Sequence, residues 1–211
     1  MSILEMLEEK KSGTKIPGVV IGIVTNNKDP DKLGRIKVKF PWLSNEDESN
    51  WARVVSLMAG KDRGIFFLPE VDDEVLVAFE NGDINQPYVI GSLWNGVDVP
   101  PETNSDGKND VKLIRSRSGH VIKIDDKDGE EKIEIIDKTK KNMIVIDSKE
   151  NKISFKSEKD IEILAPNGKM TINVKDIEIK SSGSAKIEAS SGMDLKASGN
   201  MNVKGATVNI N

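Results

Sequence analysis

Residues 175–211 read KDIEIKSSGSAKIEASSGMDLKASGNMNVKGATVNIN, and this stretch repeats itself every eight residues. One series of aliphatic side chains recurs at that period: Ile179, Ile187, Leu195 and Val203. A second series begins two residues earlier and reads Ile177, Ala185, Met193 and Met201. A separation of two residues is the period of a β-strand. A fixed internal period indicates that each unit buries its apolar face on the next unit.

The same kind of short strand is predicted upstream, back to about residue 111. Apolar residues there recur in pairs of period two: Ile122 and Ile124, Ile133 and Ile135, Met143 and Val145, Ile153 and Phe155, Ile161 and Ile163. The pentapeptide KDIEI occurs at 159–163 and again at 175–179, sixteen residues later, which is two repeats. The segment APNG at 165–168 interrupts the register. Asp128-Gly129, between two of these strands, predicts a hairpin turn rather than a calcium loop.

The core that these repeats supply is too thin for one chain to close around. Each repeat offers about two modest apolar residues, and Phe155 is the only aromatic residue after residue 110. Several copies wound together would need only one apolar residue from each chain at each level of a shared axis. We therefore predict an intertwined β-helix of three chains over 111–211, with a single-chain β-solenoid as the alternative. The axis candidates are Ile161, Ile163, Ile177, Ile179, Ile187, Leu195 and Val203.

The N-terminal half predicts a different kind of core. Eight of the nine aromatic residues lie between 40 and 94, together with short Val- and Ile-rich segments that are separated by turn signals. The strands are expected at 19–25, 35–40, 51–58, 64–68, 74–79 and 88–93, and this spacing favours a small all-β barrel or sandwich over 17–94. Residues 95–110 are rich in Pro, Gly, Asn and Asp, which predicts a linker.

Residues 1–16 are predicted to form a short helical arm. Ser2 and Glu5 have the spacing of a capping box, and Ile3, Leu4 and Leu7 form an apolar stripe at helical spacing. This stripe is interpreted either as a helix that packs back on its own domain or as an arm that docks on a partner protein.

Composition excludes several classes of chemistry. The chain has no cysteine and a single histidine, His120, so disulfides and a multi-histidine metal site within one chain are excluded, and no cofactor is expected. We interpret His120 as structural; the alternative is that three copies meet around an ion on a trimer axis. No apolar run approaches the roughly 20 residues that span a bilayer. No secretory signal is visible, which predicts synthesis in the cytoplasm.

The charge pattern argues against a nucleic-acid partner. Residues 1–110 carry 12 Lys and Arg against 19 Asp and Glu, and residues 111–211 carry 19 against 16. Neither half has the basic excess that neutralising phosphates requires.

Several N-terminal motifs resemble those of a known family. They are GRIKVKFPW at 34–42, WARV at 51–54, PEVDDEVLVAF at 69–79 and PYVIGSL at 87–93, followed by RSRSGH at 115–120. Together they resemble the OB-fold and needle entry of contractile-tail central spikes, the phage baseplate assembly protein V and the valine-glycine-repeat (VgrG) spike of type VI secretion. The resemblance covers about 17–211.

The resemblance implies a non-enzymatic, homotrimeric spike that is assembled into the baseplate of a phage tail or phage-like particle. It implies an OB-fold collar, here 17–94, that seats on a separate hub protein, and a needle that pierces the target cell envelope when a sheath contracts. On this interpretation Ile3, Leu4 and Leu7 dock on the hub, whereas Val208 and Ile210 receive a PAAR-type tip protein. Two alternatives stay open: an OB-fold nucleic-acid-binding protein, which would need a basic groove with stacking aromatic residues, and an envelope-degrading tail enzyme.

Overall fold

The computed structural model describes residues 15–43 and 47–209, and its elements are β-strands apart from one 3₁₀ turn, η1 (Glu80–Gly82). The all-β class predicted from the sequence is confirmed. The chain divides into two compact units, one ending at Lys159 and the other beginning at Asp160. The predicted hub-docking residues Ile3, Leu4 and Leu7, with the arm that carries them, lie outside the described residues, as does Ile210.

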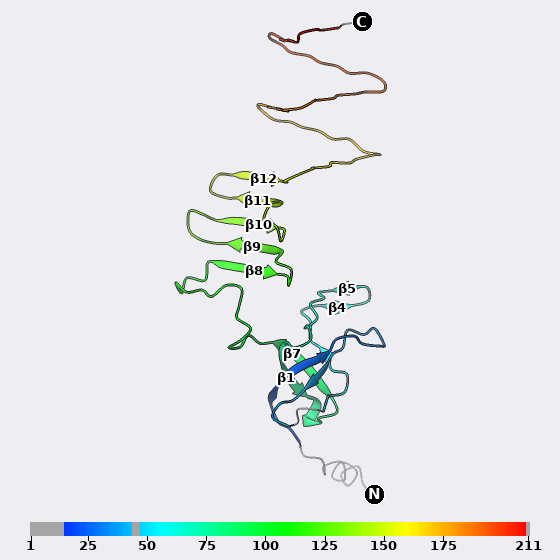
Figure 1. The fold of residues 1–211 in the computed structure, drawn as a ribbon, viewed down its shortest axis with the longest axis vertical. Helices are drawn as coiled ribbons and strands as arrows, with labels where there is room; N and C mark the ends of the chain where they lie inside the picture. The colour runs from blue at the N-terminus through cyan, green and yellow to red at the C-terminus, as the bar shows by residue number, and fades with distance from the viewer. Residues whose placement is uncertain (1–14, 44–46, 210–211) are drawn as a thin grey trace. The chain divides into compact units, whose positions relative to one another are not determined.

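The first sheet contains five strands from the N-terminal half in the order β2-β1-β6-β7-β3 (Figure 1). Their bounds are β1 Val19–Asn26, β2 Lys37–Lys39, β3 Arg53–Val54, β6 Glu74–Phe79 and β7 Pro87–Ser92. All neighbours pair antiparallel except β3 and β7, which are parallel. Register shifts interrupt the β1–β2 and β6–β7 ladders. Such irregularities raise the local twist, which lets a small sheet curl over its own core.

One side of this sheet is buried and forms a single core. Strand β6 alternates partly exposed and buried positions along its whole length, so Val75, Val77 and Phe79 point inward. The rings of Phe40 and Phe79 meet edge to face at a centroid distance of 5.5 Å. The core consists of Val24, Ile36, Val38, Phe40, Ala52, Val75, Val77, Phe79 and Val89.

The segment predicted as one strand over 51–58 is shorter in the structure. Ala52 bridges to Ile36, Arg53 and Val54 form β3, and the Val55 amide donates to the Val89 carbonyl. The chain then leaves the sheet to form an isolated hairpin of β4 (Ala59–Gly60) and β5 (Arg63–Gly64). Gly64 is required here, because it has a φ of +152° and a Cβ atom would lie 2.6 Å from the Met58 carbonyl oxygen. The residues predicted as a strand at 64–68 therefore belong mainly to this hairpin and to the chain that leaves it.

The second sheet is a five-stranded antiparallel meander that is built from consecutive hairpins (Figure 1). Its strands are β8 Val111–Arg115, β9 Val121–Asp125, β10 Lys132–Ile136, β11 Met143–Asp147 and β12 Lys152–Lys156. Each of its four turns holds one residue in the left-handed region, and these residues are Gly119, Gly129, Lys140 and Asn151. The predicted turn at Asp128-Gly129 is thus present, and these strands pair within one chain.

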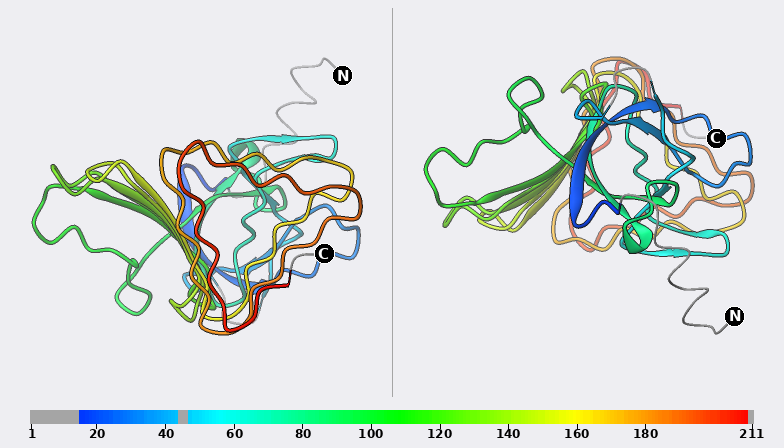
Figure 2. Two further views of the ribbon diagram at one scale, coloured as in Figure 1. Left: turned by 90° about the horizontal axis from the view of Figure 1, so that it is seen from above. Right: turned by 90° about the horizontal axis from the view of Figure 1, so that it is seen from below.

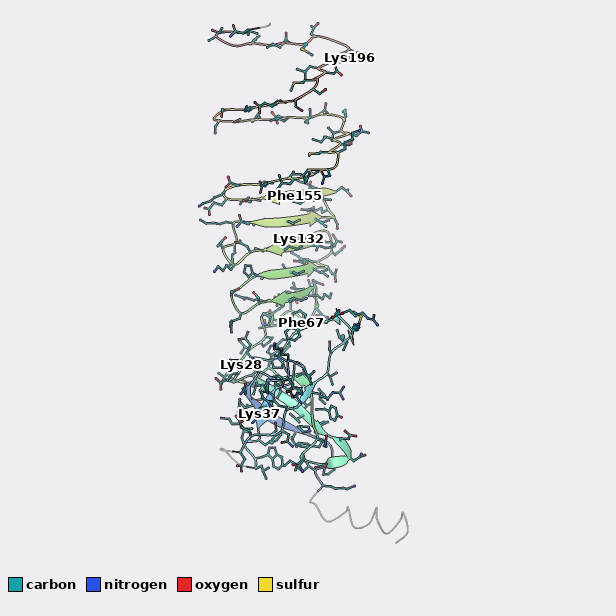
Figure 3. All side chains as sticks on the ribbon, turned by 90° about the vertical axis from the view of Figure 1, so that its right-hand side faces the viewer. Lys28, Lys37, Phe67, Lys132, Phe155 and Lys196 are labelled. Carbon is teal, nitrogen blue, oxygen red and sulfur yellow. The ribbon has the colours of Figure 1, made fainter. Side chains whose placement is uncertain are left out.

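The second unit contains no strand among its described residues, 160–209. The only backbone–backbone hydrogen bond recorded within this described range joins the Gly168 amide to the Ala165 carbonyl. Figure 1 shows the chain passing back and forth with its successive passes well apart, and the left view of Figure 2 shows these passes winding around a common centre. Figure 3 shows the side chains around Lys196 standing clear of other passes.

Candidate docking surfaces

One face of the second sheet is almost entirely isoleucine. The pairing places Ile135 opposite both Ile122 and Ile144, and it places Ile133 opposite both Ile124 and Ile146. These six side chains are between 38% and 48% exposed, so no layer in the described part of the chain covers them. The isoleucine face consists of Ile114, Ile122, Ile124, Ile133, Ile135, Ile144, Ile146, Ile153 and Phe155.

The structure corrects the predicted phase of one strand. The sequence pairs Met143 with Val145, but the register places Ile144 and Ile146 in line with the other isoleucines. Met143 and Val145 lie on the opposite face of β11. Because all four residues are apolar, alternation within the strand could not decide between the two phases; the partners across the sheet do.

The opposite face of this sheet mixes apolar side chains, such as Leu113 and Val145, with ion pairs. The Lys123 ammonium group lies 2.8 Å from the Asp125 carboxylate and 3.8 Å from that of Glu134. The hydrogen bond between Lys123 and Asp125 lowers the pKa of Asp125 and raises that of Lys123. The two faces therefore differ: this mixed face carries charges that are paired within the chain, whereas the isoleucine face is apolar and more exposed.

The predicted axis residues do not meet one another in a single chain. Ile161, Ile163, Ile177, Ile179, Ile187, Leu195 and Val203 are between 62% and 79% exposed. Val208, predicted to contact the tip protein, is also exposed. A segment of this length with exposed apolar side chains and few backbone hydrogen bonds is not a stable conformation for an isolated chain, because main-chain amides and carbonyls need partners.

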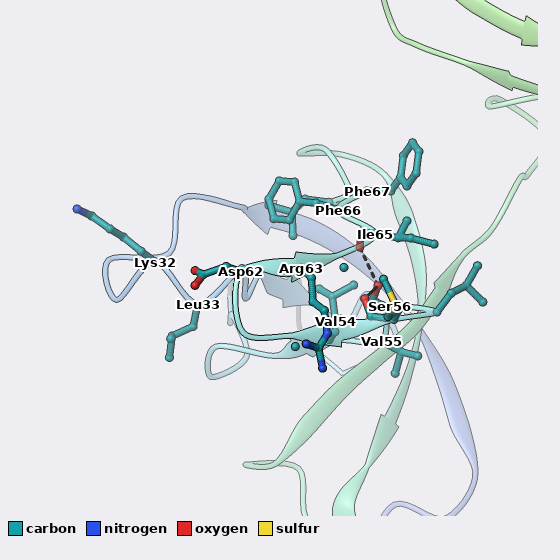
Figure 4. Close-up of a pocket in the computed structure, with 17 residues that line it drawn as sticks. Lys32, Leu33, Val54, Val55, Ser56, Asp62, Arg63, Ile65, Phe66 and Phe67 are labelled. Atoms are coloured by element: carbon teal, nitrogen blue, oxygen red, sulfur yellow. Dashed lines mark hydrogen bonds between the residues drawn. The ribbon is translucent and has the colours of Figure 1, made fainter.

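The isolated hairpin forms one wall of an open pocket of about 790 Å³ (Figure 4). The hairpin segment is defined here as residues 57–67. Leu57, Phe66 and Phe67 line the pocket and are 93%, 78% and 69% exposed. The Ser56 hydroxyl lies 3.0 Å from the Met58 carbonyl oxygen and 2.7 Å from that of Ile65, which holds the base of the hairpin closed. The sequence motifs did not single out this pocket.

The opposite wall of the pocket, Lys32 to Gly34, belongs to a loop that is fixed by a buried carboxylate. Asp29 accepts hydrogen bonds from the Leu33 amide at 3.0 Å and from the Arg35 guanidinium at 2.7 and 2.9 Å. The guanidinium holds the pKa of Asp29 well below its usual range and in turn raises the pKa of Arg35. This wall is therefore ordered by interactions within its own loop.

The two cations beside Trp51 are already neutralised. Arg35 and Lys37 lie 5.9 and 5.7 Å from the ring centroid of Trp51, which is the type of contact that stacking sites for bases use. However, Arg35 is paired with Asp29, and Lys37 is 3.0 Å from the Glu48 carboxylate. These groups do not form a basic groove for phosphates.

His120 joins two turns of the second sheet. Its Nδ1 atom accepts a hydrogen bond from the Lys138 amide at 3.2 Å, and its own amide donates to the Ser116 hydroxyl at 3.0 Å. Among the residues that the structure describes, no group of three or more His, Cys, Asp or Glu side chains could hold a metal ion, and no helix could cross a membrane.

Comparison with known proteins identifies the first sheet. Residues 20–94 match the Type VI secretion system/phage-baseplate injector OB domain. This segment belongs to that domain family, and the predicted OB-fold and the resemblance to contractile-tail central spikes are confirmed.

Several curated relatives are named as spike proteins of type VI secretion systems. The chain is 39% identical over 87 residues to the spike protein VgrG3 of Vibrio cholerae, and the match covers 39% of this chain and 9% of the relative. It is 34% identical over 128 residues to the spike protein VgrG1a of Pseudomonas aeruginosa, and that match covers 56% of this chain and 20% of the relative. Another relative, 37% identical over 87 residues, is the actin cross-linking toxin VgrG1 of Vibrio cholerae. The chain thus spans a fifth or less of the length of these relatives.

Proposed function

We propose that this chain is the structural central spike of a contractile injection particle, and that it works as a homotrimer without enzymatic activity. The observation that carries the proposal is the second unit, where an eight-residue repeat exposes both its aliphatic side chains and its backbone. Two further copies wound between the passes would supply the missing strand partners and bury the aliphatic residues on a common axis.

The isoleucine face supports the same number of chains. A one-sided apolar sheet requires a second layer to cover it. Three such sheets facing a common axis would cover one another, and because each isoleucine is already partly buried, completing its burial would contribute roughly 0.5–2 kcal/mol. The mixed face would then remain in water, where its ion pairs are already satisfied.

The proposed role is mechanical. The OB-fold domain is the collar that seats on a separate hub protein, with Ile3, Leu4 and Leu7 as docking residues. The needle is driven through the envelope of a target cell when a sheath contracts, and Val208 and Ile210 receive a PAAR-type tip protein. The chain would be made in the cytoplasm and assembled into the baseplate of a phage tail or phage-like particle. The similarity to named spike proteins over the OB domain and part of the following region supports this placement.

The axis assignment is tested by placing Asp at inward positions of two consecutive repeats and, separately, at outward positions of the same repeats. Leu195→Asp combined with Val203→Asp should abolish a trimer that resists denaturant, because three unpaired carboxylates at each level cannot be buried together. Lys196→Asp combined with Lys204→Asp is the matched control, since it introduces Asp at the two neighbouring outward positions. The measurement is the oligomer band on a denaturing gel without heating. A surviving trimer in the variant with Leu195→Asp and Val203→Asp would refute the axis assignment.

A further inference from the structure

The hairpin segment pairs with no other strand in the described part of its own chain. It forms a separate two-stranded sheet with only two residues in each strand, and an isolated hairpin of this kind is marginal in water. Phe66 and Phe67 project from it in Figure 4, and Leu57 is almost completely exposed. An exposed apolar cluster around a pocket on a soluble domain indicates an interaction site.

A second exposed apolar segment follows strand β7. We define the linker segment as residues 94–99, in which Trp94 and Val99 are exposed and Val97 is 88% exposed. The Asn95 side-chain oxygen accepts hydrogen bonds from the amides of Val97 and Asp98 at 2.8 and 2.7 Å. The turn thus holds the apolar side chain of Val97 out in solvent, where it gains nothing unless another surface covers it.

The two segments complement each other in charge as well as in polarity. The pocket is lined by Lys32 and Arg63 against a single carboxylate, Asp62. No ion pair is recorded for Lys32 or Arg63 in the described part of the chain. The linker segment carries Asp98 between Val97 and Val99. Opposite charges at the rim of an apolar contact set its register and disfavour other partners.

The linker segment of a chain does not reach its own pocket. None of residues 94–99 lines it. The Leu93 amide donates to the Glu74 carbonyl at 2.9 Å, which fixes the chain just before the segment to the first residue of β6. The Asn95 amide donates to the Asp98 carbonyl at 2.9 Å, which closes the turn within the segment. Reaching the pocket in the same chain would require breaking this turn.

We propose that the pocket beside the hairpin segment binds the linker segment of a neighbouring copy, with Val97 and Trp94 against Phe66, Phe67 and Leu57. This inference rests on the proposed trimer. A pocket on one chain and a ligand segment on the next make a heterologous contact, which closes into a ring under threefold symmetry. Tethering through the shared needle raises the effective concentration, so each contact can be weak by itself. The collar would then have an interface of its own, separate from the needle axis.

Site-directed cross-linking tests this contact, because the chain has no native cysteine. A Val97→Cys chain and a Phe67→Cys chain with different tags are co-expressed, and the purified mixed trimers are oxidised with a mild oxidant. The expected result is a disulfide-linked pair that contains both tags. Leu43→Cys replaces Phe67→Cys as the control, since Leu43 is exposed on the same domain but lines a different pocket.

A second measurement does not depend on disulfide geometry. Leu57→Ser combined with Phe67→Ser should raise hydrogen exchange of the amides in residues 94–99 at least tenfold while the mass of the oligomer stays unchanged. If the trimer forms but shows neither the cross-link nor this exchange response, this inference is wrong and the proposed function stands. The same result is expected if a hub protein occupies the pocket instead. In a chain that carries both Val97→Cys and Phe67→Cys, a disulfide within the chain and no link between chains would also overturn the inference. A monomeric chain contradicts both the proposed function and this inference.

Discussion

Two neighbouring stretches of the C-terminal repeat region behave differently: residues 111–156 pair with themselves, whereas residues 160–209 do not. The apolar residues of both stretches recur at the period of a strand, but the corners differ. Each hairpin turn of the first stretch contains a residue at positive φ, whereas no described residue from 160 onward has one. Tight hairpin turns require positive φ, so the second stretch continues around a centre instead of folding back.

This difference indicates that the turns decide which strand each strand pairs with. With reversing turns, each strand meets the next strand of its own chain and the backbone is satisfied locally. Without them, the next pass of the same chain lies apart from the strand, and in the proposed trimer the strand partner is another chain. The first stretch exposes the isoleucine face, and the second stretch exposes the axis residues.

The largest expected effect comes from adding one carboxylate to the isoleucine face of β11, compared with one on its opposite face. Ile144→Asp should destabilise the trimer by several kcal/mol per chain, because the charge would be buried against two other isoleucine faces. Val145→Asp, on the mixed face, should cost about 1–2 kcal/mol, from the lost apolar contact and from repulsion by Glu134, which lies directly opposite it. Sedimentation of each variant against chain concentration measures the difference. Equal effects at the two positions would mean that the isoleucine face is not an interface.

A smaller effect is expected from testing the corners themselves. Gly129→Ala should destabilise the chain by about 1–2 kcal/mol, because a Cβ atom is strained at the φ of +71°. Gly192→Ala should change stability by less than about 0.5 kcal/mol, since Gly192 is not among the positive-φ residues. Denaturant midpoints at one fixed chain concentration provide the comparison. A similar loss at both positions would remove the distinction between the two types of corner.

The smallest effect concerns the turn between β10 and β11. The Thr139 hydroxyl, followed by the amides of Asn142 and Lys141, lowers the pKa of Asp137 to about 2 from an ordinary value of 3.8. The stabilisation from the ionised Asp137 should be complete above pH 4 and should be lost as the pH falls through about 2. Amide exchange at Lys141 and Asn142, corrected for intrinsic rates, should rise over that range. Asp137→Asn should show no such pH step; if it keeps one, another group is responsible.

Much of the fold follows from local patterns. The all-β class, the position of β6 and the turn at Asp128-Gly129 could be predicted because alternation and turn chemistry act within a few residues. The phase of β11 could not be predicted, since Met143 to Ile146 are all apolar and only the neighbouring strands select the inward pair. The pairing of 111–156 within one chain could not be predicted either, because strand period alone does not say which chain supplies the partner.

The pocket beside the hairpin segment could not be predicted from the sequence either. Trp51 to Met58 looks like one continuous strand, yet its backbone pairing with the sheet ends at Val55. The exposure of Phe66 and Phe67 depends on where the hairpin leaves the sheet, which is a property of the folded domain. An aromatic pair beside Gly64 was the one local signal that could have indicated a surface turn with apolar side chains.

The most direct test of the central claim is the mass of the purified chain in solution, measured by light scattering or sedimentation equilibrium. The chain has a mass of 23.2 kDa. The account predicts a particle of three times that mass, which does not dissociate at micromolar concentration. A well-folded monomer of 23.2 kDa would contradict the account, because residues 160–209 would then have to satisfy their backbone and bury their aliphatic side chains without another copy.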